Sequence, residues 1–137
     1  MIRLKESIHV DRLLASVFNY TSDFRHIEEW DPGVVSSTPC QQGNAGVGSA
    51  YDLILKFGPS RPKMRYEIMA YEPFSKVVLA GEGDSFRAVD TICFSQTAAG
   101  THIEYQADIE FPGLNPIVEF CLRPILTRVG KKAMKGL

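Results

Sequence analysis

Hydrophobic and polar residues alternate over the first ten residues of the chain and again over most of the segment from 51 to 111. A period of two is typical of strands with one buried and one exposed face. In the first strand the apolar face holds Ile2, Leu4, Ile8 and Val10. Glu6 falls on that same face. The pattern therefore predicts an opening strand with one carboxylate on its apolar side.

The later alternating segments are separated by Gly-rich and Pro-rich turns, which predicts antiparallel strands joined by hairpins. These segments are 51–57, 64–70, the two sides of the turn at 81–85, and 103–111. The strand that begins at Phe86 places Asp90 on its apolar face. The last strand has the clearest alternation, with Tyr105 on its apolar face. One face of the predicted sheet meets water and the other meets a core.

Two short helices are predicted between the first strand and the later ones. Asp11 can cap the first helix by accepting backbone N–H groups. The apolar residues that follow it at helical spacing are Leu14, Val17 and Phe18. The second helix is expected to begin at Thr21 or Ser22. It should end by Asp31, because Pro32 disfavours helical backbone geometry in the residue before it.

The last predicted element is a long amphipathic helix that begins near Pro116. Its apolar stripe, with spacings of three and four, comprises Leu114, Ile117, Val118, Cys121, Leu122, Ile125, Leu126 and Val129. Pro124 is expected to kink this helix, because proline removes one backbone hydrogen bond. The basic end, RVGKKAMKGL, favours either transient contact with an anionic membrane surface or a solvated helix end that complements the helix dipole.

Composition narrows the class of protein. A chain of 137 residues with 45% hydrophobic and 23% charged residues is expected to fold as one domain over residues 1–137. The net charge of −1 gives no reason to expect a nucleic-acid partner. Three cysteines without metal-ligand spacing predict neither a disulfide framework nor a zinc site. Without a signal-like segment or a membrane span, we expect a cytoplasmic protein, a monomer or homodimer.

Four segments carry a family resemblance: SIHVDRLLASVFNYTSDFRHIEEWDPGV, VGSAYDLIL, YEIMAYEPFSKVVLAG and FRAVDTICFSQTAAGTHIEYQADIEFPG. With the order of elements, they resemble the START-like (SRPBCC) superfamily, and within it the bacterial polyketide cyclase/dehydrase-like proteins. The resemblance implies an α+β helix-grip fold, also seen in birch-pollen-allergen-like proteins. In this fold a curved antiparallel sheet of about six to seven strands wraps around the long C-terminal helix. A cavity between them holds lipids, sterols, polyketides or other apolar molecules in related proteins.

The predicted cavity-facing residues come from the apolar sheet face, the end of the second short helix and the C-terminal helix. They are Trp30, Tyr51, Leu53, Leu55, Tyr66, Ile68, Phe86, Asp90, Ile92, Tyr105, Ile117, Cys121 and Leu122. A tyrosine offers apolar surface and one hydroxyl to orient a ligand. The three tyrosines are equally compatible with core positions at which each hydroxyl finds a partner.

Asp90 has two interpretations. A buried carboxylate needs a partner or a raised pKa, which suits an acid/base group or a ligand anchor. Alternatively, a bulge turns Asp90 outward, or Asp90 pairs with Arg87 or Arg65. Glu6 has the same two interpretations: it has a functional role in the cavity, or it reaches solvent at the edge of the sheet or through a bulge. Asp90 and Tyr105 are the candidates for catalysis.

Trp30 is the only tryptophan and precedes the sequence Asp31-Pro32-Gly33. This sequence suits a type II turn, in which proline fixes φ and glycine takes the positive φ that follows. The family resemblance places Trp30 near one end of the cavity. We expect it to be a structural anchor whose edge can also line the cavity opening.

Other chemistry has little support in the sequence. The stretch GNAGVGS lacks the GxxxxGK[ST] pattern and precedes a strand, so it is not expected to bind phosphate. His9, His26 and His102 have no second ligand at metal spacing, and no GxSxG motif supports a hydrolase. No metal or cofactor is predicted.

Three functions remain. The first is a carrier that holds an apolar or amphipathic small molecule between the sheet and the C-terminal helix. The second is a cyclase or dehydratase in which Asp90 or Tyr105 moves protons in the same cavity. The third is an interaction or stress-response module, which predicts an exposed apolar patch in place of an enclosed pocket.

Overall fold

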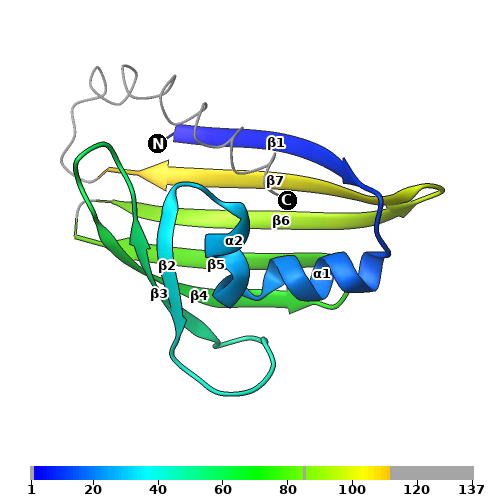
Figure 1. Ribbon diagram of the computed structural model, residues 1–137, viewed down its shortest axis with the longest axis horizontal. Coiled ribbons are helices and arrows are strands. Elements are labelled where there is room, and N and C mark those ends of the chain that lie inside the picture. The colour runs from blue at the N-terminus through cyan, green and yellow to red at the C-terminus, as the bar shows by residue number, and fades with distance from the viewer. Residues whose placement is uncertain (1, 85, 112–137) are drawn as a thin grey trace.

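The computed structural model describes residues 2–84 and 86–111, and within them the strands form one curved antiparallel sheet of seven strands (Figure 1). The strands are β1 (Ile2–Val10), β2 (Val34–Pro39), β3 (Ala50–Leu55), β4 (Lys63–Glu72), β5 (Lys76–Gly83), β6 (Arg87–Thr97) and β7 (Gly100–Glu110). Their order in the sheet is β1-β7-β6-β5-β4-β3-β2. Consecutive strands pair from β2 through β7, and β1 completes the sheet beside β7. The predicted antiparallel sheet is confirmed.

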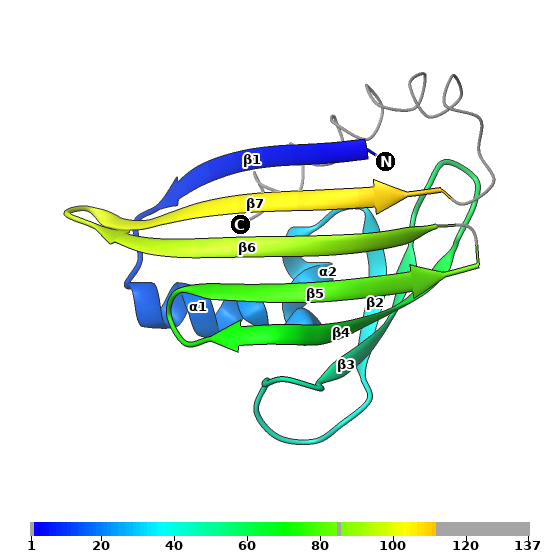
Figure 2. The same ribbon diagram turned by 180° about the vertical axis from the view of Figure 1, so that it is seen from behind.

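Three helical segments follow β1 and lie on one face of the sheet (Figure 1). They are α1 (Leu14–Ser22), the 3₁₀ helix η1 (Phe24–His26) and α2 (Ile27–Trp30). Seen from behind, the opposite face of the sheet carries no described helix (Figure 2). None of the helices in the described part of the chain has the length and apolar character needed to cross a membrane.

The uncovered face of the sheet is polar, as the alternation predicts. Long charged side chains on neighbouring strands pair across it, a common way to stabilise an exposed sheet face. The pairs are Arg3 with Asp108 at 2.7 Å, Arg65 with Asp52 at 3.0 Å, and Arg87 with Glu110 at 3.3 Å. Because these side chains are largely exposed, each pair contributes little stability.

The covered face is tightly packed under α1. Phe18 is fully buried, and its ring makes edge-to-face contacts with Tyr71, Phe74 and Phe94 at centroid distances of 5.3, 5.6 and 5.0 Å. Edge-to-face pairs are stabilising beyond the area that they bury. Phe74 has a positive φ of 62°, a costly conformation for a bulky residue, and its contact with Phe18 helps to hold it there.

The caps of the short helices differ from the prediction. The N-cap of α1 is Leu13, with no side-chain cap bond, so the prediction that Asp11 caps this helix is wrong. Asp11 lies in the bend before it, where its carboxylate is 3.5 Å from Nδ1 of His9. α1 also continues through Ser22, and the next helical segment starts after Asp23, whose side chain accepts a hydrogen bond from the backbone N–H of Arg25.

The turn after Trp30 also differs from the prediction. Gly33 does not take a positive φ, so the expected type II turn is wrong. The backbone N–H of Val34 donates to the carbonyl of Asp31 at 3.0 Å, and Oδ1 of Asp31 accepts the N–H of Gly33 at 2.8 Å. The side chain of Asp31 thus fixes the turn from inside, as Asp commonly does at this position.

Several predictions for the end of the chain lie outside the described residues. They are the C-terminal helix, its kink at Pro124, its basic end, and the candidate ligand-binding residues Ile117, Cys121 and Leu122.

Candidate functional site

A cavity of about 150 Å³ lies on the covered face of the sheet, between β1, β7 and β6 on one side and the turn after α2 on the other. Its walls are mainly apolar. The described residues that line it are Leu4, Glu6, Ile27, Asp31, Gly33, Val34, Leu53, Leu55, Lys56, Phe57, Tyr66, Phe86, Ala88, Asp90, Tyr105, Ala107, Ile109 and Phe111. An apolar wall with few polar groups is the composition typical of small-molecule sites, and the volume suits a ligand at the small end of that class.

Asp90 and Tyr105 form a hydrogen-bonded pair in this wall. Asp90 on β6 is 5% exposed, and the hydroxyl of Tyr105 on β7 donates to its Oδ2 atom. The register places Asp90 opposite Ala107 and Tyr105 opposite Ile92, so the two side chains meet diagonally across the strand pair. Among the residues that the structure describes, Tyr105 is the only hydrogen-bond partner of the Asp90 carboxyl group.

Burial raises the pKa of Asp90 to about 7, because a carboxylate loses hydration inside an apolar wall. The hydrogen bond from Tyr105 opposes this rise, and the negative charges of Asp31 and Asp108 add to it. Burial also raises the pKa of Tyr105, followed by the charge of Asp90. At neutral pH Asp90 is therefore divided between its acid and its base form, while Tyr105 keeps its proton.

The structure excludes the alternative placements of Asp90. β6 pairs with β7 without a register shift from Arg87 to Thr97, so no bulge turns the side chain outward. Arg87 and Arg65 pair with carboxylates on the opposite face of the sheet. Asp90 therefore faces the cavity.

Two further carboxyl groups line the same cavity. Glu6 remains on the inward side because β1 pairs with β7 in unbroken register, with Glu6 opposite Tyr105. No bulge turns Glu6 outward, but β1 is an edge strand of the sheet, and Glu6 is half-buried. Asp31 projects from the turn after α2, and burial raises its pKa, against the effect of the Gly33 N–H bond.

Tyr66 reaches the cavity from β4 because Gly81 on β5 leaves room for its ring. A Cβ atom at position 81 would come within 2.6 Å of the Tyr66 ring. Tyr66 is 7% exposed, and burial, followed by the charges of Asp90 and Asp31, raises its pKa. Its side chain lines the cavity, and its hydroxyl makes no hydrogen bond to a described residue.

Trp30 supports the cavity wall from behind. It is 2% exposed and does not line the cavity. Its ring packs edge-to-face against Phe24 at 6.3 Å and against Tyr105 at 6.2 Å. Trp30 is therefore an anchor that fixes the position of Tyr105, and the prediction that its edge lines the cavity is not supported by this geometry.

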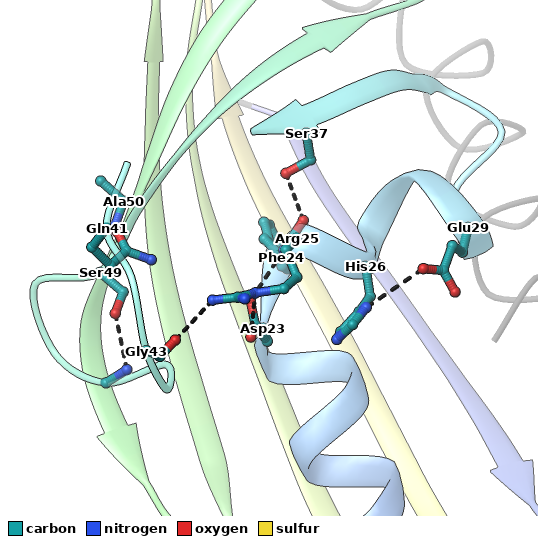
Figure 3. Close-up of polar contacts among 11 residues, drawn as sticks. Asp23, Phe24, Arg25, His26, Glu29, Ser37, Gln41, Gly43, Ser49 and Ala50 are labelled. Carbon is teal, nitrogen blue, oxygen red and sulfur yellow. Dashed lines mark hydrogen bonds and ion pairs between the residues drawn. The ribbon is translucent and has the colours of Figure 1, made fainter. Parts of the chain in front are cut away.

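A set of polar contacts holds the helical segments that carry the site (Figure 3). The Ser37 hydroxyl on β2 donates to the carbonyl of Phe24 at 2.6 Å. The Arg25 guanidinium contacts the Asp23 carboxylate at 2.9 Å and donates to the carbonyl of Gly43 at 2.8 Å. These contacts tie η1 to β2 and to the β2–β3 loop, and so position α2 and Asp31 over the sheet.

The predicted ligand-binding residues occupy different parts of the covered face. Six line the cavity: Leu53, Leu55, Tyr66, Phe86, Asp90 and Tyr105. Ile68 and Ile92 point to the same face but are buried in the core, outside the cavity lining. Tyr51 is fully buried beside Phe24, and burial, followed by Asp23, raises its pKa. A role in binding stays a prediction for all of them.

Sequence reasoning misses several lining residues. The sequence assigns Asp31 only to a turn, and the pattern gives no sign that this turn folds back over the sheet. Leu4, Ala88, Ala107 and Ile109 lie on predicted apolar faces, and their small or aliphatic side chains give no chemical signal. Their position along the strands is what brings them to the cavity.

Other reactive groups lie elsewhere in the described structure. Within residues 2–84 and 86–111, no group of three His, Cys, Asp or Glu side chains could hold a metal ion. His9 forms a hydrogen bond with Thr97 at 2.9 Å on the exposed side of the sheet. Cys40 is exposed and Cys93 half-buried, and both are free thiols.

Comparison with known proteins gives a family and a fold. The family model described as polyketide cyclase/dehydrase and lipid transport matches residues 1–137. No curated protein matches the sequence.

Several solved structures share the fold at low sequence identity. The protein TTHA0849 from Thermus thermophilus is 13% identical with a TM-score of 0.82, over 98% of this chain and 92% of that one. A START superfamily protein from Mycobacterium smegmatis is 15% identical with a TM-score of 0.75, over 97% and 94%. The di-domain ARO/CYC StfQ from the steffimycin biosynthetic pathway is 12% identical with a TM-score of 0.75, over 98% of this chain and 48% of that one.

Proposed function

The chain belongs to the polyketide cyclase/dehydrase and lipid transport family, and from this membership we propose that it binds a small apolar or amphipathic molecule in the cavity on the covered face of the sheet. The observation that carries this proposal is the cavity itself, an apolar space with a buried carboxyl group in its wall. Burial of apolar ligand surface contributes roughly 25 cal/mol per Å² before ordering costs.

Filling the cavity tests this proposal. Ala107 lines it from β7, so a phenyl ring placed there by Ala107→Phe would occupy the space that a ligand needs. We expect native mass spectrometry of the protein purified from its own host to show a bound small molecule in the wild type and to show at least about tenfold less of it in the variant. Ala80→Phe, on the opposite face of β5, is the matched control.

The proposal fails if the Ala107→Phe variant folds and retains the same bound molecule at the same occupancy. It fails equally if the wild-type protein carries no small molecule and takes up none from a lipid and polyketide extract.

A second candidate function is ring closure with loss of water, and the placement of Asp90 favours it. Asp90 faces the cavity, and its pKa of about 7 suits a group that both accepts and returns a proton at neutral pH. As carboxylate, Asp90 would take a proton from a carbon next to a carbonyl group. The carbanion would attack a distant carbonyl, and the protonated acid would return its proton to the new oxygen. Asp90 would then take a second proton from the same carbon and give it to the departing hydroxyl group, so that water leaves and a carbon–carbon double bond forms.

A linear triketone tests this second candidate. Aldol closure and loss of water convert a seven-carbon triketone to orcinol, which absorbance and mass spectrometry detect. We expect Asp90→Asn to lower the rate at least about a hundredfold, the scale of general acid–base catalysis. Asp52→Asn on the opposite face is the control. Equal rates with wild type, Asp90→Asn and no protein would exclude this activity for Asp90.

A further inference from the structure

The charges of the cavity wall are unbalanced. Three carboxyl groups line it, those of Glu6, Asp31 and Asp90, and the only described basic residue in its lining is Lys56, which is exposed. No ion pair involves any of the three carboxyl groups among the described residues. Carboxyl groups in an apolar wall without a cation are costly, so a positive group that entered the cavity would relieve the imbalance.

Several polar atoms of residues that line the cavity also make no hydrogen bond to a described residue. Oδ1 of Asp90 has no partner among the described residues, since Tyr105 donates to Oδ2. The Tyr66 hydroxyl, although its residue is 7% exposed, likewise has no described partner. Oδ1 of Asp31 accepts the N–H of Gly33, and Oδ2 has no described partner. Acceptor oxygens therefore outnumber donors in an otherwise apolar space.

We propose that the cavity selects amphipathic molecules whose polar end is a protonated amine, with the ammonium group bound by the carboxylates of Asp90 and Asp31 and the apolar body against the aromatic and aliphatic walls. This inference rests on the proposed binding function and specifies its ligand class. An ammonium group supplies three donors and a positive charge. A carboxylate ligand would add a fourth carboxyl group to the same wall, and an alcohol would bring no positive charge to it.

Proton release distinguishes this binding mode. Free Asp90 has a pKa of about 7, so it is roughly half protonated at neutral pH. An ammonium group beside it stabilises the ionised form and lowers the pKa, so binding releases a proton. A bound carboxylate would raise the pKa of Asp90 instead, so its binding would take up a proton. The other titratable or charged groups that line the cavity with Asp90 are Tyr105, Tyr66, Asp31, Glu6 and Lys56, and Asp108 acts on Asp90 from the outer face.

The experiment compares three probes that share a phenyl ring and a short alkyl arm: phenethylamine, phenethyl alcohol and hydrocinnamate. Isothermal titration calorimetry at pH 7, in buffers of different ionisation enthalpy, gives the affinity and the number of protons released. We expect the amine to bind at least about tenfold more tightly than the alcohol, with release of up to about half a proton. Hydrocinnamate should bind most weakly of the three.

Single substitutions test whether Asp90 is the group that gives the amine preference and the proton release. Asp90→Asn keeps the shape of the side chain and removes its charge, so the amine should lose its preference over the alcohol and its proton release. Asp52→Asn removes a carboxylate from the opposite face and should change neither quantity. Should Asp90→Asn fail to fold, Asp31→Asn is expected to reduce the preference for the amine in the same direction. The three probes with the wild-type protein also show, without any variant, whether amine binding releases a proton.

The outcomes separate this inference from the function on which it rests. If the alcohol or hydrocinnamate binds as tightly as the amine, or if amine binding releases no proton, the amine site is wrong while small-molecule binding stands. If none of the three probes binds and no co-purified molecule is found, the binding function itself is wrong, and the inference falls with it.

Discussion

The two ends of the covered sheet face are built from the same strands but are packed in opposite ways. Under α1, the inward positions of β6 and β7 hold Phe94 and Ile103, and Phe18 fills the space between them and the helix. Near the turn after α2, inward positions of the same strands hold Ala88 and Ala107, and a cavity remains. Small residues at inward positions therefore create a space that the alternation pattern alone does not reveal.

Polarity differs between the two ends as well as volume. The α1 end consists of aromatic and aliphatic side chains, which the sheet can bury without hydrogen-bond partners. The cavity end contains Asp90, Tyr105 and Glu6 on inward positions that the pattern reserves for apolar residues. A protein that places a carboxyl group inside loses stability and gains a chemical group that water cannot easily reach. The α1 end is thus expected to provide stability, and the cavity end to provide chemistry.

The largest expected effect is loss of the Phe18 ring. Phe18→Ala would leave a void among three aromatic partners, so we expect the free energy of unfolding to fall by about 3–5 kcal/mol. Phe86→Ala, at the half-buried cavity end, removes the same ring and should cost less than half as much. Urea denaturation measures both. Equal losses would show that the two ends contribute equally to stability and would contradict the difference described above.

Asp90 should make stability depend on pH in an unusual direction. Its pKa is about 7 in the folded protein and near 4 in the unfolded chain, so the folded state binds more protons between these values. Stability contributed by this group is therefore full below pH 4, declines as pH rises, and is lost above pH 7. The upper bound on the loss is about 4 kcal/mol, from three units of pKa.

Asp90→Asn removes this dependence and measures its size. We expect the variant to be more stable than the wild type at pH 8, by about 1–3 kcal/mol after the weakened bond from Tyr105 is counted, and to lose that advantage at pH 4. Thermal unfolding from pH 4 to pH 8 gives the curve for both proteins. A wild-type protein that gains stability as pH rises across this range, relative to the variant, would contradict the assignment.

The most local effect concerns the space that Gly81 leaves for Tyr66. Gly81→Ala would push a methyl group into the Tyr66 ring, and we expect a loss of about 1–3 kcal/mol together with a shifted tyrosine at the cavity wall. Gly46→Ala is the control, because a Cβ there meets no atom within 4 Å and the backbone has no positive φ. Tyrosine ring signals in NMR spectra report the shift. If Gly81→Ala and Gly46→Ala behave alike, the close packing of Tyr66 on β5 is wrong.

The sequence predicts which face a residue occupies better than where along the strand it lies. Alternation places Asp90, Tyr105 and Ile92 on one face, and the structure agrees. Alternation cannot tell that Ile92 is buried in the core while Asp90 lines the cavity, because that depends on where the helices pack. The same limit explains why the pattern groups Ile68 and Tyr51 with the cavity residues.

The sequence pattern is too weak to predict β2 and the turn after α2. The pattern does not identify β2 as a separate strand, because its Ser, Thr and Pro residues and a register shift between Val34 and Ser36 break the alternation. Pro32 reveals the turn that brings Asp31 over the sheet, but its type and direction depend on the side-chain bond to Gly33 and on contacts with β2. These features are set by tertiary contacts that no short segment contains.

The register of the hairpin between β6 and β7 brings Asp90 and Tyr105 together. Thr97 pairs with Gly100, so two residues close the turn, and from there the register runs without a shift to the Asp90–Tyr105 contact. Two extra residues absorbed into β7, with the turn kept at two residues, would keep every side chain on its present face and slide Tyr105 by about 7 Å along β6. Such an insertion would separate Asp90 from Tyr105 without replacing either residue. Relatives with the same core and the same site residues could therefore differ in activity.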